Sequence, residues 1–167
     1  QIEIGSARVD PGAMRRISSW IHDFVWENNP DIAEQHVDNR PEIHCVYPRV
    51  TLLEKIEAIA RAFDDRIKAA TAFARHYEDA FRIIRYDDLE PSELVNLLAE
   101  MKGTGDIANW PSSSHKAFQP DDSERWQEVE RAWHAISSMF WGERYTLDLC
   151  SDAIRKLLVA LEEQWEG

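Results

Sequence analysis

Apolar residues recur at helical spacing along most of this chain, and that pattern limits the folds open to it. Trp126, Val129, Trp133, Ile136 and Phe140 lie three or four positions apart, which predicts one amphipathic helix, ended by glycine at 142. The chain is therefore expected to be mainly α, a bundle of about five helices. Similar apolar stripes predict the other helices, which lie at roughly 14–26, from 51 onward, at 70–85, at 91–103 and up to 165.

Only two segments alternate apolar and polar residues as a strand does. They are Gln1–Gly5 and Glu42–Tyr47, and we expect them to pair. Two strands alone make a marginal sheet, so the short β element is expected to belong to a larger sheet upstream. The chain also opens without Met, inside a strand pattern, and we therefore expect the C-terminal part of a longer protein. Residues 1–50 would be the incomplete end of an α/β domain, and residues 51–167 a helical domain.

Composition narrows the class of protein. No run approaches 18 apolar residues, so the sequence predicts no membrane span. Two cysteines, Cys45 and Cys150, do not suggest a disulfide framework and fit the reducing cytoplasm.

The net charge of −12 is unevenly spread along the chain. Residues 1–53 carry 5 basic and 8 acidic side chains, residues 54–85 carry 7 and 6, and residues 86–167 carry 7 and 17. A freestanding nucleic-acid binder would not have so acidic a C-terminal half. Only residues 54–85 are expected to face phosphate without strong repulsion.

Charged residues on two successive helices are the candidates for chemistry. Arg75 and Asp79 are four apart, on the face opposite Tyr77, and Lys55 lies at the edge of its helix's apolar stripe. Each of these residues also has an interpretation in which it plays no part in chemistry. Arg75 and Asp79 would form a surface ion pair contributing about 0.3–0.5 kcal/mol, Lys55 would extend its ammonium to solvent, and His76 would be a solvated helix histidine.

The stretches that carry these residues are Thr51-Leu52-Leu53-Glu54-Lys55-Ile56 and Arg75-His76-Tyr77-Glu78-Asp79-Ala80. Together they resemble the second half of the AbiEii/MenT-type nucleotidyltransferase toxins of toxin–antitoxin and abortive-infection systems. The likeness continues, in the same order, through three further segments: residues 2–5, 116–120 and 132–142.

The resemblance implies an enzyme that transfers a nucleotide from an NTP, with Mg²⁺, to an RNA acceptor such as tRNA. Lys55 and Asp79 would be catalytic, Lys55 and Arg75 would bind the nucleotide, and Glu3 would be a carboxylate near the metal. The β element would then remain from an upstream nucleotidyltransferase sheet. A cognate antitoxin would be a partner, and RNA would contact the upstream half and residues 54–85.

The sequence also departs from the family pattern. Glu78 stands where an aromatic residue is usual, Ala80 where leucine is usual, and Glu3 where aspartate is common. The family's Gly-Ser/Thr phosphate turn and Asp-x-Asp metal pair are absent from these residues. The resemblance therefore implies that this chain alone is inactive, with no tightly bound cofactor.

Two other functions remain open at this stage. The chain could be a non-catalytic helical module that binds a protein partner through its acidic surface, or a purely structural helical domain. A Gly-Ser/Thr turn and an Asp-x-Asp pair encoded upstream would favour the transferase, and their absence there would favour the binding module.

Overall fold

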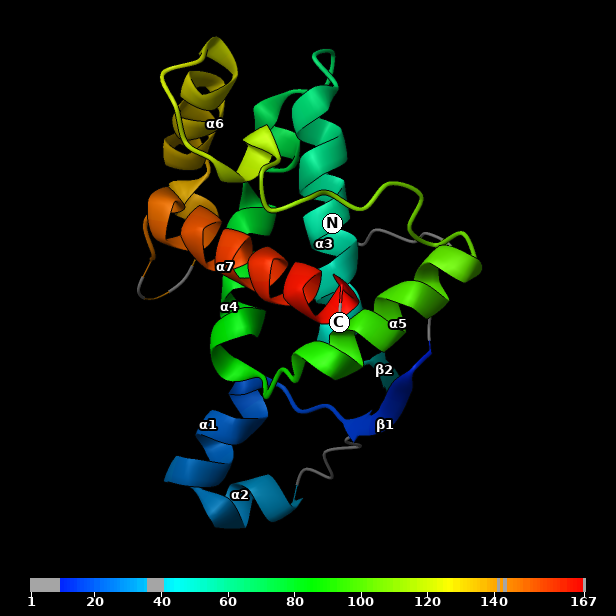
Figure 1. The fold of residues 1–167 in the computed structure, drawn as a ribbon. Coiled ribbons are helices and arrows are strands. Elements are labelled where there is room, and N and C mark those ends of the chain that lie inside the picture. The colour runs from blue at the N-terminus through cyan, green and yellow to red at the C-terminus, as the bar shows by residue number, and fades with distance from the viewer. Residues whose placement is uncertain (1–9, 36–40, 141, 143, 167) are drawn as a thin grey trace. The chain divides into compact units, whose positions relative to one another are not determined.

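The computed structural model describes residues 10–35, 41–140, 142 and 144–166. Within that part the chain is mainly α, with seven α-helices and one two-stranded antiparallel sheet (Figure 1). This confirms the fold class expected from the apolar periodicity. The chain divides into two compact units, residues 1–47 and residues 48–167, and each is described by itself.

The first unit contains the sheet. Strand β1, Gly12–Arg16, pairs with β2, Glu42–Val46, so that Gly12 lies opposite Val46 and Arg16 opposite Glu42. The strand expected near residue 42 is confirmed, but its partner is Gly12–Arg16. The expected Gln1–Gly5 strand lies outside the described residues.

The first helix begins later than the apolar spacing indicated. Helix α1 spans Trp20–Asn28, because the Ser19 side chain accepts the backbone N–H of His22 and caps the first turn. The prediction of a helix over 14–26 was wrong at its start. Residues 12–16 form strand β1 and pair with β2 instead, and the N–H of Ile17 donates to Pro41 O just before β2. A short helix α2, Pro30–Gln35, follows α1.

The described part of the second unit contains five longer helices and three short 3₁₀ turns. Helix α5 spans Pro91–Gly103, as the sequence predicted from proline at the first helical position and glycine at the end. The elements in chain order are α3 Pro48–Asp64, η1 Ala70–Ala72, α4 Arg75–Tyr86, α5 Pro91–Gly103, η2 Lys116–Phe118, α6 Glu124–Ala135, η3 Ser137–Met139 and α7 Leu147–Glu166.

Three helix boundaries differ from the sequence prediction for local reasons. Helix α3 starts at Pro48 rather than Thr51, because proline fits the first helical turn, where no N–H partner is needed. Helix α4 starts at Arg75 rather than near residue 70, because residues 70–72 form the 3₁₀ turn η1. The helix expected up to Phe140 ends as α6 at Ala135, and η3 follows it.

The core of this unit joins α3, α4, η2, α6 and α7. Tyr77 and Trp126 are buried at its centre, with ring centroids 6.0 Å apart. The polar group of each of these two rings donates a hydrogen bond to a backbone carbonyl of η2. The Tyr77 hydroxyl donates to Ala117 O at 2.7 Å, and Trp126 Nε1 donates to Lys116 O at 2.8 Å. Burial holds the pKa of Tyr77 well above its ordinary value, so it stays a neutral donor. The two large rings therefore also fix the loop before α6.

Helix α7 completes the unit by crossing over α4 and reaching α5 (Figure 1). Its apolar stripe of Cys150, Ile154, Leu158 and Leu161 is buried there. Nowhere in the described ranges is there a helix long and apolar enough to cross a lipid bilayer.

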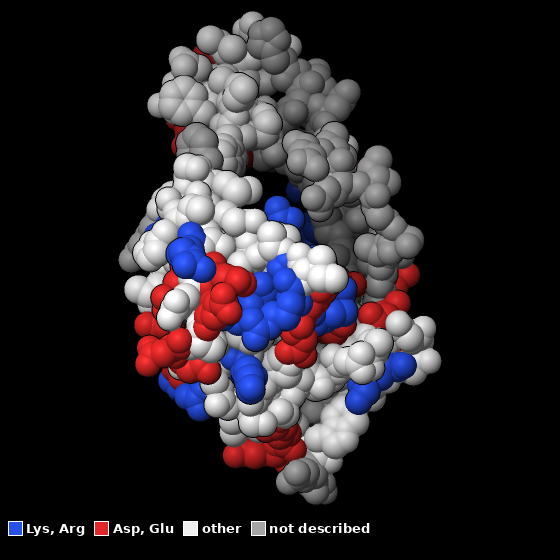
Figure 2. Space-filling model, turned by 90° about the horizontal axis from the view of Figure 1, so that it is seen from above, with Lys and Arg blue, Asp and Glu red and all other residues white. Residues whose placement is uncertain are grey.

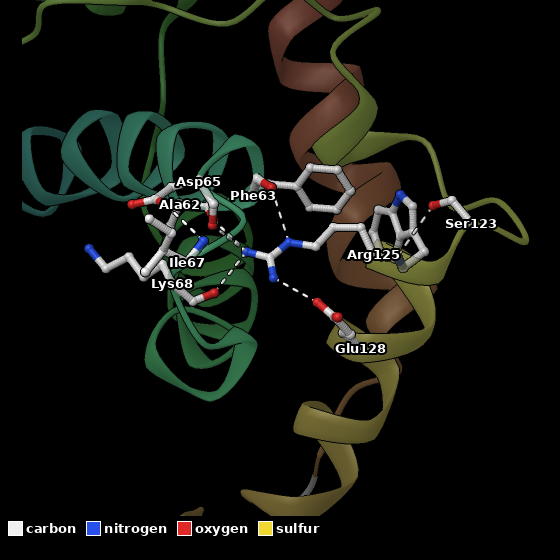
Figure 3. A network of polar contacts seen from close by, with 9 residues as sticks. Ala62, Phe63, Asp65, Ile67, Lys68, Ser123, Arg125 and Glu128 are labelled. Atoms are coloured by element: carbon white, nitrogen blue, oxygen red, sulfur yellow. Dashed lines mark hydrogen bonds and ion pairs between the residues drawn. The ribbon is translucent and has the colours of Figure 1, made fainter.

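A single buried arginine joins the end of α3 to α6 (Figure 3). Arg125 is only 3% exposed, and its Nη2 donates to the carbonyl oxygens of Ala62, Asp65 and Lys68 at 2.7, 3.1 and 3.0 Å. Its Nε donates to Phe63 O at 3.0 Å, and its Nη1 pairs with Glu128 at 2.7 Å. The last carbonyls of a helix lack intrahelical partners, so Arg125 supplies the donors that α3 itself cannot.

Candidate functional site

The side chains of Lys55 and Asp79 meet between α3 and α4. Lys55 Nζ lies 2.9 Å from Asp79 Oδ2, with exposed fractions of 24% and 36%. The two residues come from different helices and are 24 positions apart, so only the packing of α3 against α4 brings them together. Both remain partly accessible, which leaves the ammonium and the carboxylate able to contact a ligand.

His76 is a third member of this group. Its Nδ1 lies 3.1 Å from Lys55 Nζ and 3.5 Å from Asp79 Oδ2. An ammonium only donates, so a neutral ring accepts from Lys55 at Nδ1, whereas a protonated ring can donate from Nδ1 to Asp79. The side chain is 17% exposed, so the expectation of a solvated histidine was wrong. The i,i+3 spacing from Asp79 was the one sequence signal that could have found it.

The surroundings of Asp79 favour its charged form. Burial alone would raise the pKa of Asp79, but hydrogen bonds from His76 and Lys55, together with their charges, lower it further than burial raises it. The net result is a pKa below the ordinary value of an aspartic acid, so the group is ionised at neutral pH.

The lowered pKa of Asp79 predicts how the stability of the fold changes with pH. An acid with a depressed pKa in the folded state adds stability above its unfolded pKa, about 3.9, and loses that contribution as the pH falls through the folded value. The stability lost on Asp79→Asn is expected to be largest near neutral pH and to shrink below about pH 4. Urea unfolding of both proteins at several pH values measures this difference.

Asp88→Asn is the matched control, because Asp88 is exposed in the link after α4 and makes no ion pair among the described residues. Its difference from the wild type should stay nearly constant with pH. A pH-independent effect of Asp79→Asn would contradict the lowered pKa.

Arg75 and Glu3 are the other two predicted site residues. Arg75 begins α4 and is half-buried, but Asp79 pairs with Lys55 and His76, so the expected Arg75–Asp79 ion pair is not formed. Its role as a phosphate ligand stays a prediction. Glu3 lies outside the described residues, so its role as a carboxylate near the metal also stays a prediction.

Glu78, one of the departures from the family pattern, has a structural role beside the site. It is fully buried, and its two carboxylate oxygens are bound separately: Arg82 Nη2 lies 2.7 Å from Oε1, and Arg144 Nε lies 3.0 Å from Oε2. Burial, and then the charge of Glu78, raises the pKa of Cys150 to about 12, so that thiol stays protonated. Glu78 thus faces the core while its neighbour Asp79 faces the site.

The sequence comparison places these residues in a family. A family model described as "Nucleotidyl transferase AbiEii toxin, Type IV TA system" matches residues 1–149. The chain belongs to the AbiEii family. Comparison with curated proteins and with solved structures gives no significant match. Lys55, His76 and Asp79 all lie within the AbiEii match, which confirms the resemblance and makes this a member of a nucleotidyl transferase toxin family.

The described part of this AbiEii chain does not by itself fit a magnesium ion. Mg²⁺ in phosphoryl transfer is held by carboxylates and by substrate phosphates, and here Asp79 is the single carboxylate of the group, already paired with an ammonium. Among the described residues, no three His, Cys, Asp or Glu side chains are placed to hold a metal. The Lys55–His76–Asp79 group is suited instead to presenting a positioned cation to a phosphate.

Proposed function

We propose that this chain is part of a nucleotidyl transferase toxin that transfers a nucleotide from an NTP to an RNA acceptor such as tRNA in the cytoplasm. A cognate antitoxin would restrain it. The observation that carries the proposal is the 2.9 Å contact between Lys55 and Asp79, two residues that the family likeness selects and that lie together in a partly accessible site.

Each residue is proposed to act through charge. Nucleotidyl transfer consists mainly of positioning and of stabilising charge on phosphate. Lys55 would contact the triphosphate as a point charge, and Asp79 would orient the ammonium before the nucleotide binds. Arg75 would hold a second phosphate, and Glu3 would be a carboxylate near the metal.

Magnesium is proposed to act only in a longer protein. When bound with the NTP, the ion would neutralise phosphate charge and stabilise the leaving pyrophosphate. Because Asp79 alone does not fit the ion, its ligands would come from carboxylates beyond the described group. The 167-residue chain is therefore expected to be inactive by itself.

Incorporation of labelled nucleotide tests this function. The longer protein, incubated with labelled NTPs, Mg²⁺ and total tRNA, should label RNA, and the 167-residue chain at the same concentration should not. Labelling by the chain alone would show that our assignment of the metal ligands is wrong. No labelling by either protein, with the longer protein folded, would favour the alternative of a non-catalytic module that binds a protein through its acidic surface.

A further inference from the structure

A hollow of about 380 Å³ lies between the turn after α3 and the side of α6. The turn contributes residues 66–71, and α6 contributes Arg125, Glu128 and Arg131 among others. Figure 2 views the end of the helical unit that carries this turn and the start of α6, and Lys and Arg side chains gather in the middle of that face. The size is within the range of pockets that hold small ligands.

The side chains that line this hollow are mostly positive, whereas the chain as a whole has a net charge of −12. Four cations line it, Arg66, Lys68, Arg125 and Arg131, against one carboxylate, Glu128, whereas residues 86–167 carry 7 basic and 17 acidic side chains. The pKa of Glu128 is lowered, first by its hydrogen bond from Arg125 and then by the charges of Arg125, Arg131 and Arg66. The hollow is therefore a local concentration of positive charge.

Three of these cations form no ion pair with another described residue. Arg66, Lys68 and Arg131 are exposed, and within the described residues they make neither an ion pair nor a contact over an aromatic ring. Most other cations of residues 48–167 are engaged in one of these ways, namely Arg49, Lys55, Arg61, Arg82, Arg85, Lys102, Arg125, Arg144, Arg155 and Lys156. Unpaired cations around one concavity are arranged to receive anions.

Hydrogen bonds from Arg125 hold the backbone around the hollow in place. Arg125 holds the carbonyls of Asp65 and Lys68 at 3.1 and 3.0 Å, and this ties both sides of the turn to α6 (Figure 3). Ile67, between them, is 97% exposed and gives the rim an apolar surface. The exposed cations thus project from backbone that is held in place rather than from a free loop.

We propose that this hollow binds the phosphates of a single-stranded RNA segment. Positively charged grooves follow the backbone of single strands, and an exposed apolar side chain beside them offers a surface to an unstacked base. The turn begins where α3 ends at Asp64, nine residues from Lys55, which is about 14 Å along the helix axis. A strand that crosses the hollow can therefore extend toward Lys55. The identity of this RNA as the acceptor rests on the proposed function.

Fluorescence anisotropy with a short labelled single-stranded RNA tests the proposal on the 167-residue chain. In about 50 mM salt the wild type should bind, and the double variant Arg66→Glu/Arg131→Glu should bind at least about tenfold more weakly. The slope of log affinity against log salt should fall by about 1.4, about 0.7 for each lost phosphate contact. Helix content by circular dichroism should be unchanged, because both side chains are exposed.

The matched control is Arg155→Glu/Lys156→Glu on α7, which changes net charge equally but lies at an acidic site where both cations pair with Asp152. It should retain wild-type affinity. No RNA binding by the wild type, or equal loss in both double variants, would overturn the proposal. Equal competition by a polyglutamate peptide or by free NTP would also overturn it, since the site would then recognise charge or a nucleotide rather than a strand.

The RNA-binding result is separable from the enzymatic one. Loss of binding in the Arg66/Arg131 variant would support the RNA site even if Lys55 proved dispensable for transfer. Intact binding in that variant would remove the RNA site and leave the Lys55–Asp79 assignment untouched.

Discussion

The proposed toxin carrying Lys55→Ala or Asp79→Ala is expected to lose growth inhibition while keeping its soluble expression. Lys55 would act on phosphate charge that develops during transfer, and removing such a group costs on the order of 3 kcal/mol in the transition state, or at least about 100-fold in rate. The fold should change far less, because the pair is partly exposed, and pairs of that kind contribute about 1 kcal/mol or less. Growth of cells expressing each variant at matched soluble levels is the measurement.

The chain offers a matched control for this experiment on α7. Lys156 and Asp152 form another lysine–aspartate ion pair, with Nζ 2.7 Å from Oδ2, but they lie beyond the residues that the family model matches. Lys156→Ala and Asp152→Ala should therefore keep full toxicity. If all four variants are equally toxic, the assigned site is wrong, and the ion pair between α3 and α4 has only a structural role.

His76→Gln separates two roles within the same group. Glutamine keeps a hydrogen-bond acceptor near Lys55 Nζ but cannot take up a proton. If the histidine only positions the ammonium, this variant should keep most of its activity, whereas His76→Leu should lose it. Transfer rates of both variants across pH 5.5–8 distinguish positioning from proton uptake, since only the latter makes the wild-type rate follow a titration that the glutamine variant lacks.

The helical part of the fold was predictable because its signals are local. Apolar spacing and proline or glycine at the ends predicted α5 with its bounds, and the stripe through Trp126 and Trp133 predicted the body of α6. The start of α1 was mispredicted because residues 12–16 pair with a strand thirty positions away. No helical periodicity contains information about such a distant partner.

The candidate site was predictable only in part, for the same reason. Family likeness singled out Lys55 and Asp79, but helix patterning alone favoured an Arg75–Asp79 pair on one helix over the observed contact between two helices. His76 was overlooked because a histidine on a polar face usually faces solvent, and its burial depends on how α3 lies against α4. Side chains that act across helices are determined by packing, which local sequence does not specify.

Arg125→Ala is expected to cause the largest loss of stability of any substitution considered. Arg125 precedes Trp126 in an acidic, amphipathic helix, and nothing local indicates that its guanidinium reaches carbonyl groups some sixty residues earlier. Truncation would leave four backbone carbonyls without their donor and Glu128 without its partner. Breaking a buried charged network of this kind costs about 3–5 kcal/mol, a large share of the 5–15 kcal/mol that stabilises a typical domain.

Urea and thermal unfolding of the purified chain measure this loss. For a protein of this length a loss of 3 kcal/mol should lower Tm by about 6–12 °C. Arg125→Lys should lose nearly as much, because a single ammonium cannot reproduce a planar fork that donates to carbonyls on both sides of a turn. Arg131→Ala, an exposed arginine six residues later on the same helix, is the control and should change stability by no more than about 0.5 kcal/mol. Equal stability of the Arg125 and Arg131 variants would mean that the end of α3 is held by its apolar packing alone, through Phe63 and Trp126, and that the buried guanidinium is dispensable.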